Sequence, residues 1–111
     1  MKAAVLHGQN DLRVEKVDMP KINEDEVLVR VKASGVCGSD MPRVLGTGAH
    51  YYPIILGHEF SGEVVEIGKN VTNVQVGDKV AGAPLLPCHK CVDCLRGYYS
   101  PCKHYSFIGS R

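Results

Sequence analysis

The sequence predicts a mainly β domain, because short alternating segments are separated by polar turns and helix signals are few. The clearest alternation runs over residues 27–33, where apolar side chains occupy every second position. Weaker strand signals cover residues 2–7, 12–17, 62–67 and 79–82. Polar turns at 8–11, 23–25 and 76–78 separate these segments. Short strands joined in this way are typical of a sandwich or a barrel.

Helical structure is predicted at one place, after residue 38. Ser39 or Asp40 is suited to cap one or two helical turns, with Pro42 in the first turn and Gly46 as the end. From Pro84 onward the sequence predicts irregular structure, because cysteines and prolines are dense there and alternation is lost. We therefore expect residues 84–104 to form a lobe that is held together by its ligands rather than by an apolar core.

Length and charge limit the classes of function. The chain has 111 residues, which fits one domain, and its formal net charge is +1, which does not favour a nucleic-acid partner. No apolar run approaches the roughly 20 residues that cross a bilayer, and no signal peptide is evident, so no membrane role is expected. These observations predict a cytoplasmic protein, in which cysteines serve as metal ligands or functional thiols rather than disulfides.

Four cysteines form the most specific motif. Their spacing is C-x2-C-x2-C-x7-C, with the members Cys88, Cys91, Cys94 and Cys102. Four thiolates close a tetrahedral zinc site and leave no open position, so this site is expected to be structural. Four unrelated cysteines and an iron–sulfur cluster are the alternatives. The bacterial ferredoxin motif ends x3-C-P, whereas here the last gap is seven residues and Pro101 precedes the last cysteine.

A second possible site combines Cys37 with His58 and Glu59. One thiolate, one imidazole and one carboxylate can hold a zinc ion that keeps a position open for water or substrate. Each residue alone is a weak signal. A single cysteine is usually a small buried apolar residue, and a single histidine is more often a hydrogen-bonded polar group than a ligand. The residues by themselves leave both interpretations open.

The segment 57–71 reads G-H-E-x2-G-x5-G-x2-V and is similar to the zinc signature of zinc-dependent medium-chain alcohol and polyol dehydrogenases. Cys37-Gly-Ser-Asp upstream, the turn at 76–80 and the cysteine lobe downstream follow that family's order. The resemblance covers essentially the whole chain. It implies a GroES-like irregular β-barrel with short helices and a zinc lobe at 84–104. Residues 1–111 would then be the N-terminal part of the catalytic domain. The family's cofactor-binding Rossmann domain is not expected in this chain, which has no G-x-G-x-x-G.

The resemblance also implies roles. Cys37 and His58 would hold a catalytic zinc, Glu59 would either ligate it directly or exchange with water, and Asp40 would accept the second N–H of the histidine ligand. Ser39 would take the proton of the substrate hydroxyl. Helix capping is the competing explanation for Ser39 and Asp40. The implied reaction moves a hydride from a polyol or polyol phosphate to NAD(P), giving a ketone. The whole protein would be a homo-oligomer, and this chain alone would be inactive. The non-enzymatic alternative is a zinc-stabilised binding module.

Several neighbouring residues have more than one interpretation. Simple alcohol dehydrogenases carry a relay histidine three positions after the serine, where this chain has Pro42, and His50 is a conceivable substitute. Arg43 would contact a substrate phosphate or be an ordinary solvated charge, of which the second is favoured. Tyr51 and Tyr52 would line a polyol pocket or simply pack beside the proline that follows them.

Overall fold

The computed structural model describes residues 1–110 and contains eight strands and three short helical segments. In chain order the elements are β1 (Lys2–Gly8), β2 (Asp11–Lys16), β3 (Val27–Ser34), the 3-10 turn η1 (Gly38–Asp40), α1 (Met41–Leu45), β4 (Ile54–Ile55), β5 (Phe60–Ile67), β6 (Lys79–Ala81), β7 (Leu85–Leu86), α2 (Val92–Leu95) and β8 (Ser106–Phe107). Within the described part of the chain, no helix has the length and apolar character needed to cross a bilayer.

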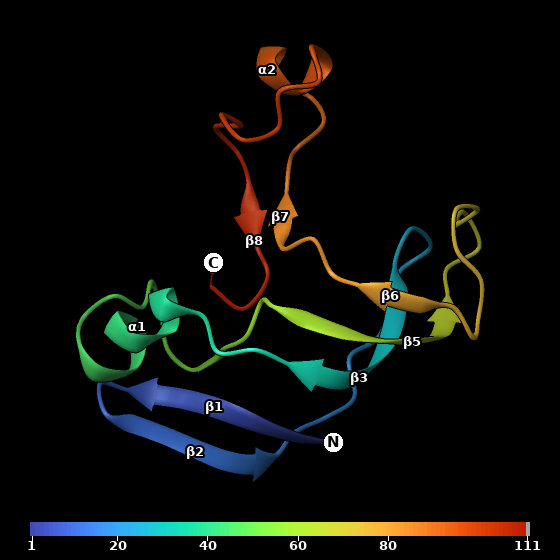
Figure 1. Cartoon of the computed structure of the whole chain (residues 1–111). Helices are drawn as coiled ribbons and strands as arrows, with labels where there is room; N and C mark the ends of the chain where they lie inside the picture. The colour runs from blue at the N-terminus through green and yellow to red at the C-terminus, as the bar shows by residue number, and fades with distance from the viewer. Residues whose placement is uncertain (111) are drawn as a thin grey trace.

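The strands form two three-stranded sheets and one two-stranded ribbon. The sheets have the orders β2-β1-β4 and β3-β5-β6, and β7 pairs with β8. Every pairing is antiparallel. The ribbon projects away from the two sheets and carries α2 at its far end (Figure 1). This projection explains why the radius of gyration is 15.3 Å, larger than the roughly 13 Å expected of a compact chain of this length.

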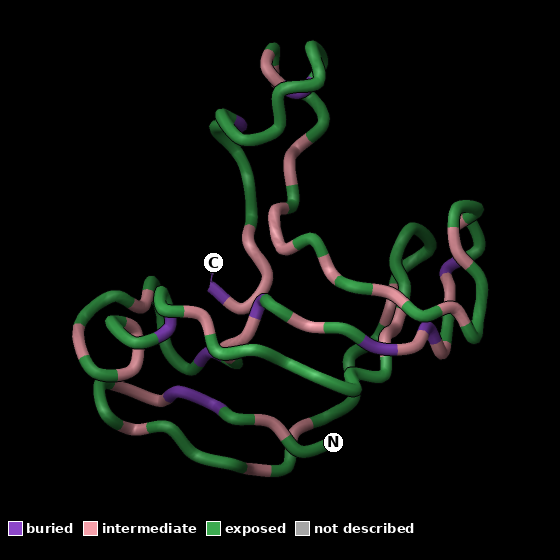
Figure 2. Tube along the Cα trace, in the orientation of Figure 1, coloured by how far each residue is buried: buried purple, intermediate pink, exposed green. Residues whose placement is uncertain are grey.

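The buried apolar residues are few and lie in separate places. Val5 and Leu6 of β1 pair with Ile55 and Ile54 of β4, and Leu6 is fully buried. Val64 is the buried centre of β5. In the lobe, the buried residues are Cys94 and Cys102 (Figure 2). The lobe therefore has little apolar packing of its own, as the cysteine spacing predicts.

The structure confirms the predicted strands with small shifts at their ends, corrects the expectation for residues from Pro84 onward and adds the unpredicted strand β4. Residues from Pro84 onward are not wholly irregular, because β7, α2 and β8 lie there. These elements are two to four residues long, which is too short for alternation or helical periodicity to be seen in the sequence. β4 was missed for the same reason, since it has only two residues.

Gly62 allows β5 to pass close to β3, and its replacement by alanine is expected to destabilise the sheet. A Cβ at this position would lie 2.3 Å from the carbonyl oxygen of Arg30 and 2.7 Å from a methyl carbon of Val29. Because backbone atoms must move to relieve the overlap, we expect Gly62→Ala to cost about 1–3 kcal/mol of unfolding free energy. Urea denaturation measures the difference. Gly8→Ala is the control, because nothing lies within 4 Å of its Cβ; equal stability of the two variants would contradict the prediction.

Candidate functional site

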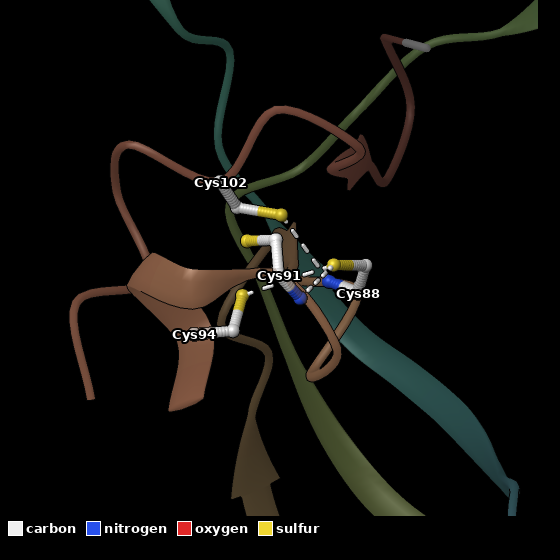
Figure 3. A group of neighbouring side chains, drawn as sticks. All are labelled: Cys88, Cys91, Cys94 and Cys102. Carbon is white, nitrogen blue, oxygen red and sulfur yellow. Dashed lines mark hydrogen bonds between the residues drawn. The ribbon is translucent and has the colours of Figure 1, made fainter. Parts of the chain in front are cut away.

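The β7–β8 ribbon brings four cysteines together at its far end. Cys88 follows β7, and Cys91 and Cys94 lie at the start of α2 and within it. Cys102 lies in the segment that returns to β8. The four sulfur atoms point toward one another (Figure 3) and all lie within 4.8 Å of one another. All five cysteines of the chain are within the described residues, and none of them forms a disulfide.

The geometry of this cluster fits a zinc ion. Sulfur ligands about 2.3 Å from a tetrahedral zinc stand about 3.8 Å from one another. The Sγ atoms of Cys88 and Cys94 are 3.9 Å apart. Four thiolates would leave no position for a substrate, so the cluster has the chemistry of a closed structural site.

The protonation of these thiols depends on their backbone surroundings. The backbone N–H groups of Lys90 and Cys91 point at the sulfur of Cys88 and lower the pKa of that thiol to about 6. The pKa of Cys91 is also lowered, mainly by the backbone N–H of Cys94. Burial raises the pKa of Cys94 to about 12. At neutral pH, zinc binding would therefore require removal of a proton from Cys94, whereas Cys88 would already be largely ionised.

This difference predicts how many protons zinc releases when it binds. At pH 7.5, which lies above the pKa of about 6 for Cys88, the cluster should release fewer than four protons per zinc. Below pH 6 the number should rise toward four, because Cys88 is then protonated before zinc arrives. Calorimetric titration of the metal-free chain in buffers of different ionisation enthalpy gives the count. Release that does not vary between pH 5.5 and 7.5 would contradict the assignment.

A second cluster forms where β3 ends and β5 begins. Ser34 pairs with Phe60 in the antiparallel ladder, and the backbone N–H of Gly35 continues the pairing to the carbonyl oxygen of Glu59 at 2.7 Å. Cys37 lies just beyond one strand end and His58 just before the other. As a result, ligand atoms of Cys37, His58 and Glu59 lie within 4.8 Å of one another.

This cluster differs from the first in its donors and its exposure. His58 is buried, Cys37 is half-buried and Glu59 is exposed. The Nδ1 atom of His58 is buried without a hydrogen-bond partner among the described residues. One thiolate, one imidazole and one carboxylate fit zinc and leave one tetrahedral position for another ligand. The exposed side of the cluster is therefore suited to a substrate or water.

Asp40 and Ser39 lie against the metal-ligating candidates instead of capping α1. Asp40 occupies the position before α1, but its side chain makes no capping hydrogen bond there. Its carboxylate accepts the backbone N–H of Cys37 at 3.2 Å and lies 3.6 Å from Nδ1 of His58. The hydroxyl of Ser39 donates to the sulfur of Cys37 at 3.3 Å. Neither residue therefore caps α1, although the bond that Asp40 accepts from the backbone N–H of Cys37 is half of a capping box at the start of η1.

Arg43 is the main residue of this region that the sequence did not predict correctly. The preferred interpretation, a solvated charge, is wrong, because its side chain is only 14% exposed. It donates hydrogen bonds to Ser39, Asp40 and the distant Ser110. Ser110 carries no sequence signal at all, since its contact spans 67 residues of chain. The Nη1 and Nη2 atoms of Arg43 thus bind partners within the chain, whereas its buried Nε atom has no hydrogen-bond partner among the described residues.

The remaining candidates lie outside both clusters. His50, Tyr51 and Tyr52 are exposed, and Tyr51 keeps 52% of its surface accessible. The interpretation of the two tyrosines as packing residues is therefore not supported by the structure. His50 does not belong to either group of ligand atoms found among residues 1–110.

Comparisons with known proteins identify the family of the chain. The profile of the alcohol dehydrogenase GroES-like domain matches residues 23–110. Galactitol 1-phosphate 5-dehydrogenase of Escherichia coli K12 is 51% identical over 112 residues, covering 100% of this chain and 32% of that protein. Sorbitol dehydrogenase of Bombyx mori is 46% identical, covering 97% of this chain and 32% of that protein. The chain thus spans about a third of the length of these curated relatives.

Solved structures give the same result for the fold. The crystal structure of galactitol-1-phosphate dehydrogenase from Escherichia coli matches with a TM-score of 0.96 and 51% identity, over 100% of this chain and 32% of that one. A zinc-binding dehydrogenase from Sinorhizobium meliloti, bound to NADP, matches with a TM-score of 0.90 and 34% identity, over 99% of this chain and 32% of that one. With a GroES-like fold, a matching profile over most of its length and these relatives, the chain belongs to the alcohol dehydrogenase GroES-like domain family.

Proposed function

We propose that residues 1–111 are the zinc-binding part of the catalytic domain of an NAD(P)-dependent polyol dehydrogenase, with residues 84–104 as its structural zinc lobe. The observation that carries the proposal is the pairing of one closed and one open ligand cluster in the same domain. The four-cysteine group suits a structural ion, and the group of Cys37, His58 and Glu59 suits a catalytic one. The substrate is a polyol or polyol phosphate resembling galactitol 1-phosphate, as the identity of 51% to that dehydrogenase supports.

The residues around the open cluster would have two roles, binding of the zinc ion and orientation of its histidine ligand. Cys37, His58 and Glu59 hold the zinc ion, which when bound acts as a Lewis acid and makes the substrate hydroxyl more acidic. Asp40, which is buried 3.6 Å from Nδ1 of His58, orients the imidazole and fixes its tautomer. This orientation leaves the other ring nitrogen free to act as the ligand.

Ser39 would handle the proton of the substrate. Its hydroxyl is exposed beside the cluster and contacts the sulfur of Cys37 at 3.3 Å. It would accept the proton from the substrate hydroxyl and pass it to water, because the position of the relay histidine is taken by Pro42. NAD(P), when bound, would supply the hydride acceptor for the carbon that bears this hydroxyl, so that the alcohol would become a ketone.

The cofactor, the assembly and the location of the whole protein belong to the same proposal. The NAD(P) site would lie in a Rossmann domain outside this chain, so residues 1–111 alone would not turn over substrate. Crystal structures of similar dehydrogenases are described as bound to NADP and complexed with NADH. The whole protein would be a cytoplasmic homo-oligomer whose partner is a small-molecule substrate, without a role at a membrane or on nucleic acid.

The alternative of a non-enzymatic, zinc-stabilised binding module is not favoured. It needs only the cysteine lobe to hold metal and treats Cys37 and His58 as core residues. Ligand atoms of Cys37, His58 and Glu59 all lie within 4.8 Å of one another. Packing of unrelated core residues does not require such a convergence of metal-ligand atoms. The curated relatives named above are also dehydrogenases.

Assays of substrate oxidation by the whole protein test the proposal. Galactitol 1-phosphate, galactitol and sorbitol are each offered with NAD⁺ and with NADP⁺, and formation of reduced cofactor is followed by its absorbance. The expected result is oxidation of at least one polyol or polyol phosphate, with activity lost on chelation of zinc and restored by adding zinc back. A zinc-loaded protein that reduces neither cofactor with any of these substrates would overturn the proposal.

A further inference from the structure

Arg43 joins three parts of the chain that meet at the open cluster. Its Nη1 atom donates to the carbonyl oxygen of Ser39 at 2.9 Å, to the hydroxyl of Ser39 at 3.0 Å and to the carboxylate of Asp40 at 3.2 Å. Its Nη2 atom donates to the hydroxyl of Ser110 at 2.6 Å. Asp40 and Ser110 are both buried, with 6% and 4% of their surface exposed. The guanidinium of Arg43 therefore connects these parts of the chain by hydrogen bonds and is not a solvent-exposed charge.

The guanidinium constrains the direction of both groups that it contacts beside the cluster. Arginine can only donate hydrogen bonds, so it occupies an acceptor position on the Ser39 hydroxyl. The hydrogen of that hydroxyl must then point elsewhere, and it lies toward the sulfur of Cys37. The carboxylate of Asp40 is held between Arg43, the backbone N–H of Cys37 and the ring of His58.

Ser110 connects the guanidinium of Arg43 to the segment that returns from the cysteine lobe. The ring of Phe107 in β8 packs edge-on against the ring of His58, with centroids 5.4 Å apart. Gly109, at a φ of 66°, crosses Gly57 so closely that a Cβ there would lie 2.1 Å from the carbonyl oxygen of Gly57. Residues 107–110 therefore lie directly on the loop that carries His58, and Arg43 fastens their end.

We propose that Arg43 is a positioning residue for the open cluster. By hydrogen bonds to Ser110 on one side and to Ser39 and Asp40 on the other, it holds the segment that returns from the cysteine lobe beside the open cluster. This inference rests on the proposed function, because it assumes that Cys37, His58 and Glu59 bind a metal ion. Arg43 touches neither the ligand atoms nor a substrate. It acts by fixing the residues that orient them, and the segment returning from the lobe contributes to the open site through Ser110.

Cobalt(II) titration of the chain tests this positioning role without relying on turnover. One equivalent of zinc first fills the four-thiolate cluster, and cobalt(II) is then added while its visible absorption is recorded. The Cys37→Ser variant identifies the band that belongs to the open cluster. The variants are Arg43→Met, Arg43→Lys and Ser110→Ala, with Arg13→Met as a control that breaks an exposed pair with Asp11.

We expect Arg43→Met to weaken cobalt binding at the open cluster about tenfold and to alter its visible spectrum, in line with the effect of losing outer-sphere partners. Arg43→Lys should recover part of this loss, because lysine keeps the charge but cannot reach Ser39, Asp40 and Ser110 together. Ser110→Ala keeps the contact between Arg43 and Asp40, so the guanidinium stays paired with a carboxylate. This variant should weaken cobalt binding at the open cluster about threefold. Arg13→Met should have no effect, and zinc at the cysteine cluster should stay bound throughout.

Three results would overturn the inference, and they differ in what they say of the proposed function. If wild-type protein binds cobalt at the open cluster and both Arg43→Met and Ser110→Ala bind it equally well, Arg43 has no positioning role and the proposed function stands. The same conclusion follows if the variants lose metal from both clusters together, because Arg43 then serves only the stability of the fold. If the wild-type chain shows no second metal site, the proposed function fails and this inference fails with it.

Discussion

Replacement of Cys37 by serine is expected to lower the turnover of the whole protein by about a thousandfold or more. The thiolate is one of only three donors that the described residues contribute to the open cluster. A Lewis-acid metal contributes several kcal/mol to the stabilisation of negative charge on the substrate oxygen, and about 1.4 kcal/mol corresponds to a factor of ten in rate. Steady-state oxidation of the preferred polyol, measured alongside zinc content, gives the effect.

The fold should survive this change, because Cys37 lies in a loop and is half-buried. The Cys37→Ser protein is therefore expected to keep the zinc of the cysteine lobe and to unfold near the wild-type temperature. Ser39→Ala is the matched variant, since it removes the neighbouring hydroxyl but no metal ligand. It should retain both zinc ions and lose about a hundredfold in rate. Turnover near the wild-type rate in Cys37→Ser would contradict the catalytic assignment.

Replacement of Cys91 by serine is expected to unfold the lobe while leaving the two sheets in place. The lobe has little apolar core, because only Cys94 and Cys102 are buried among residues 84–104. Binding of a structural zinc supplies roughly 10 kcal/mol or more in small zinc domains, and this binding energy is also folding energy. Hydrogen exchange should show loss of protection over residues 88–104 in the variant.

This experiment distinguishes unfolding of the cysteine lobe from unfolding of the two sheets. Amides of β1 and β5, which contain the buried residues Leu6 and Val64, should keep their protection in Cys91→Ser. Metal analysis should show the loss of one zinc ion per chain. If the lobe stays protected without its zinc, the cluster does not hold the lobe together and the structural assignment is wrong.

The β-rich fold could be predicted because the longer strands repeat every two residues. Apolar side chains occupy every second position over residues 27–33, a period that an α-helix does not produce. The strand β3 indeed spans Val27–Ser34. β4, β7 and β8, with two residues each, form only because distant segments pair with them. A two-residue strand has no periodicity of its own, so its position depends on contacts that the local sequence does not encode.

The candidate site could be predicted to the extent that its chemistry lies in motifs. The four cysteines are close together in the sequence, and the signature at 57–71 identified His58 and Glu59 together. Arg43 and Ser110 had no such signal, because their contact joins residues 67 positions apart. The structure also shows how Cys37 meets His58, since the pairing of Ser34 with Phe60 brings the two loops together.

Metal analysis of the purified, reduced protein, prepared without a metal-affinity tag, tests most directly whether the domain holds one structural and one catalytic zinc. The account predicts about two zinc ions per chain, one lost in Cys91→Ser and the other in Cys37→Ser. Visible colour from iron should be absent. A single zinc ion that persists in Cys37→Ser, or iron in place of zinc, would contradict it.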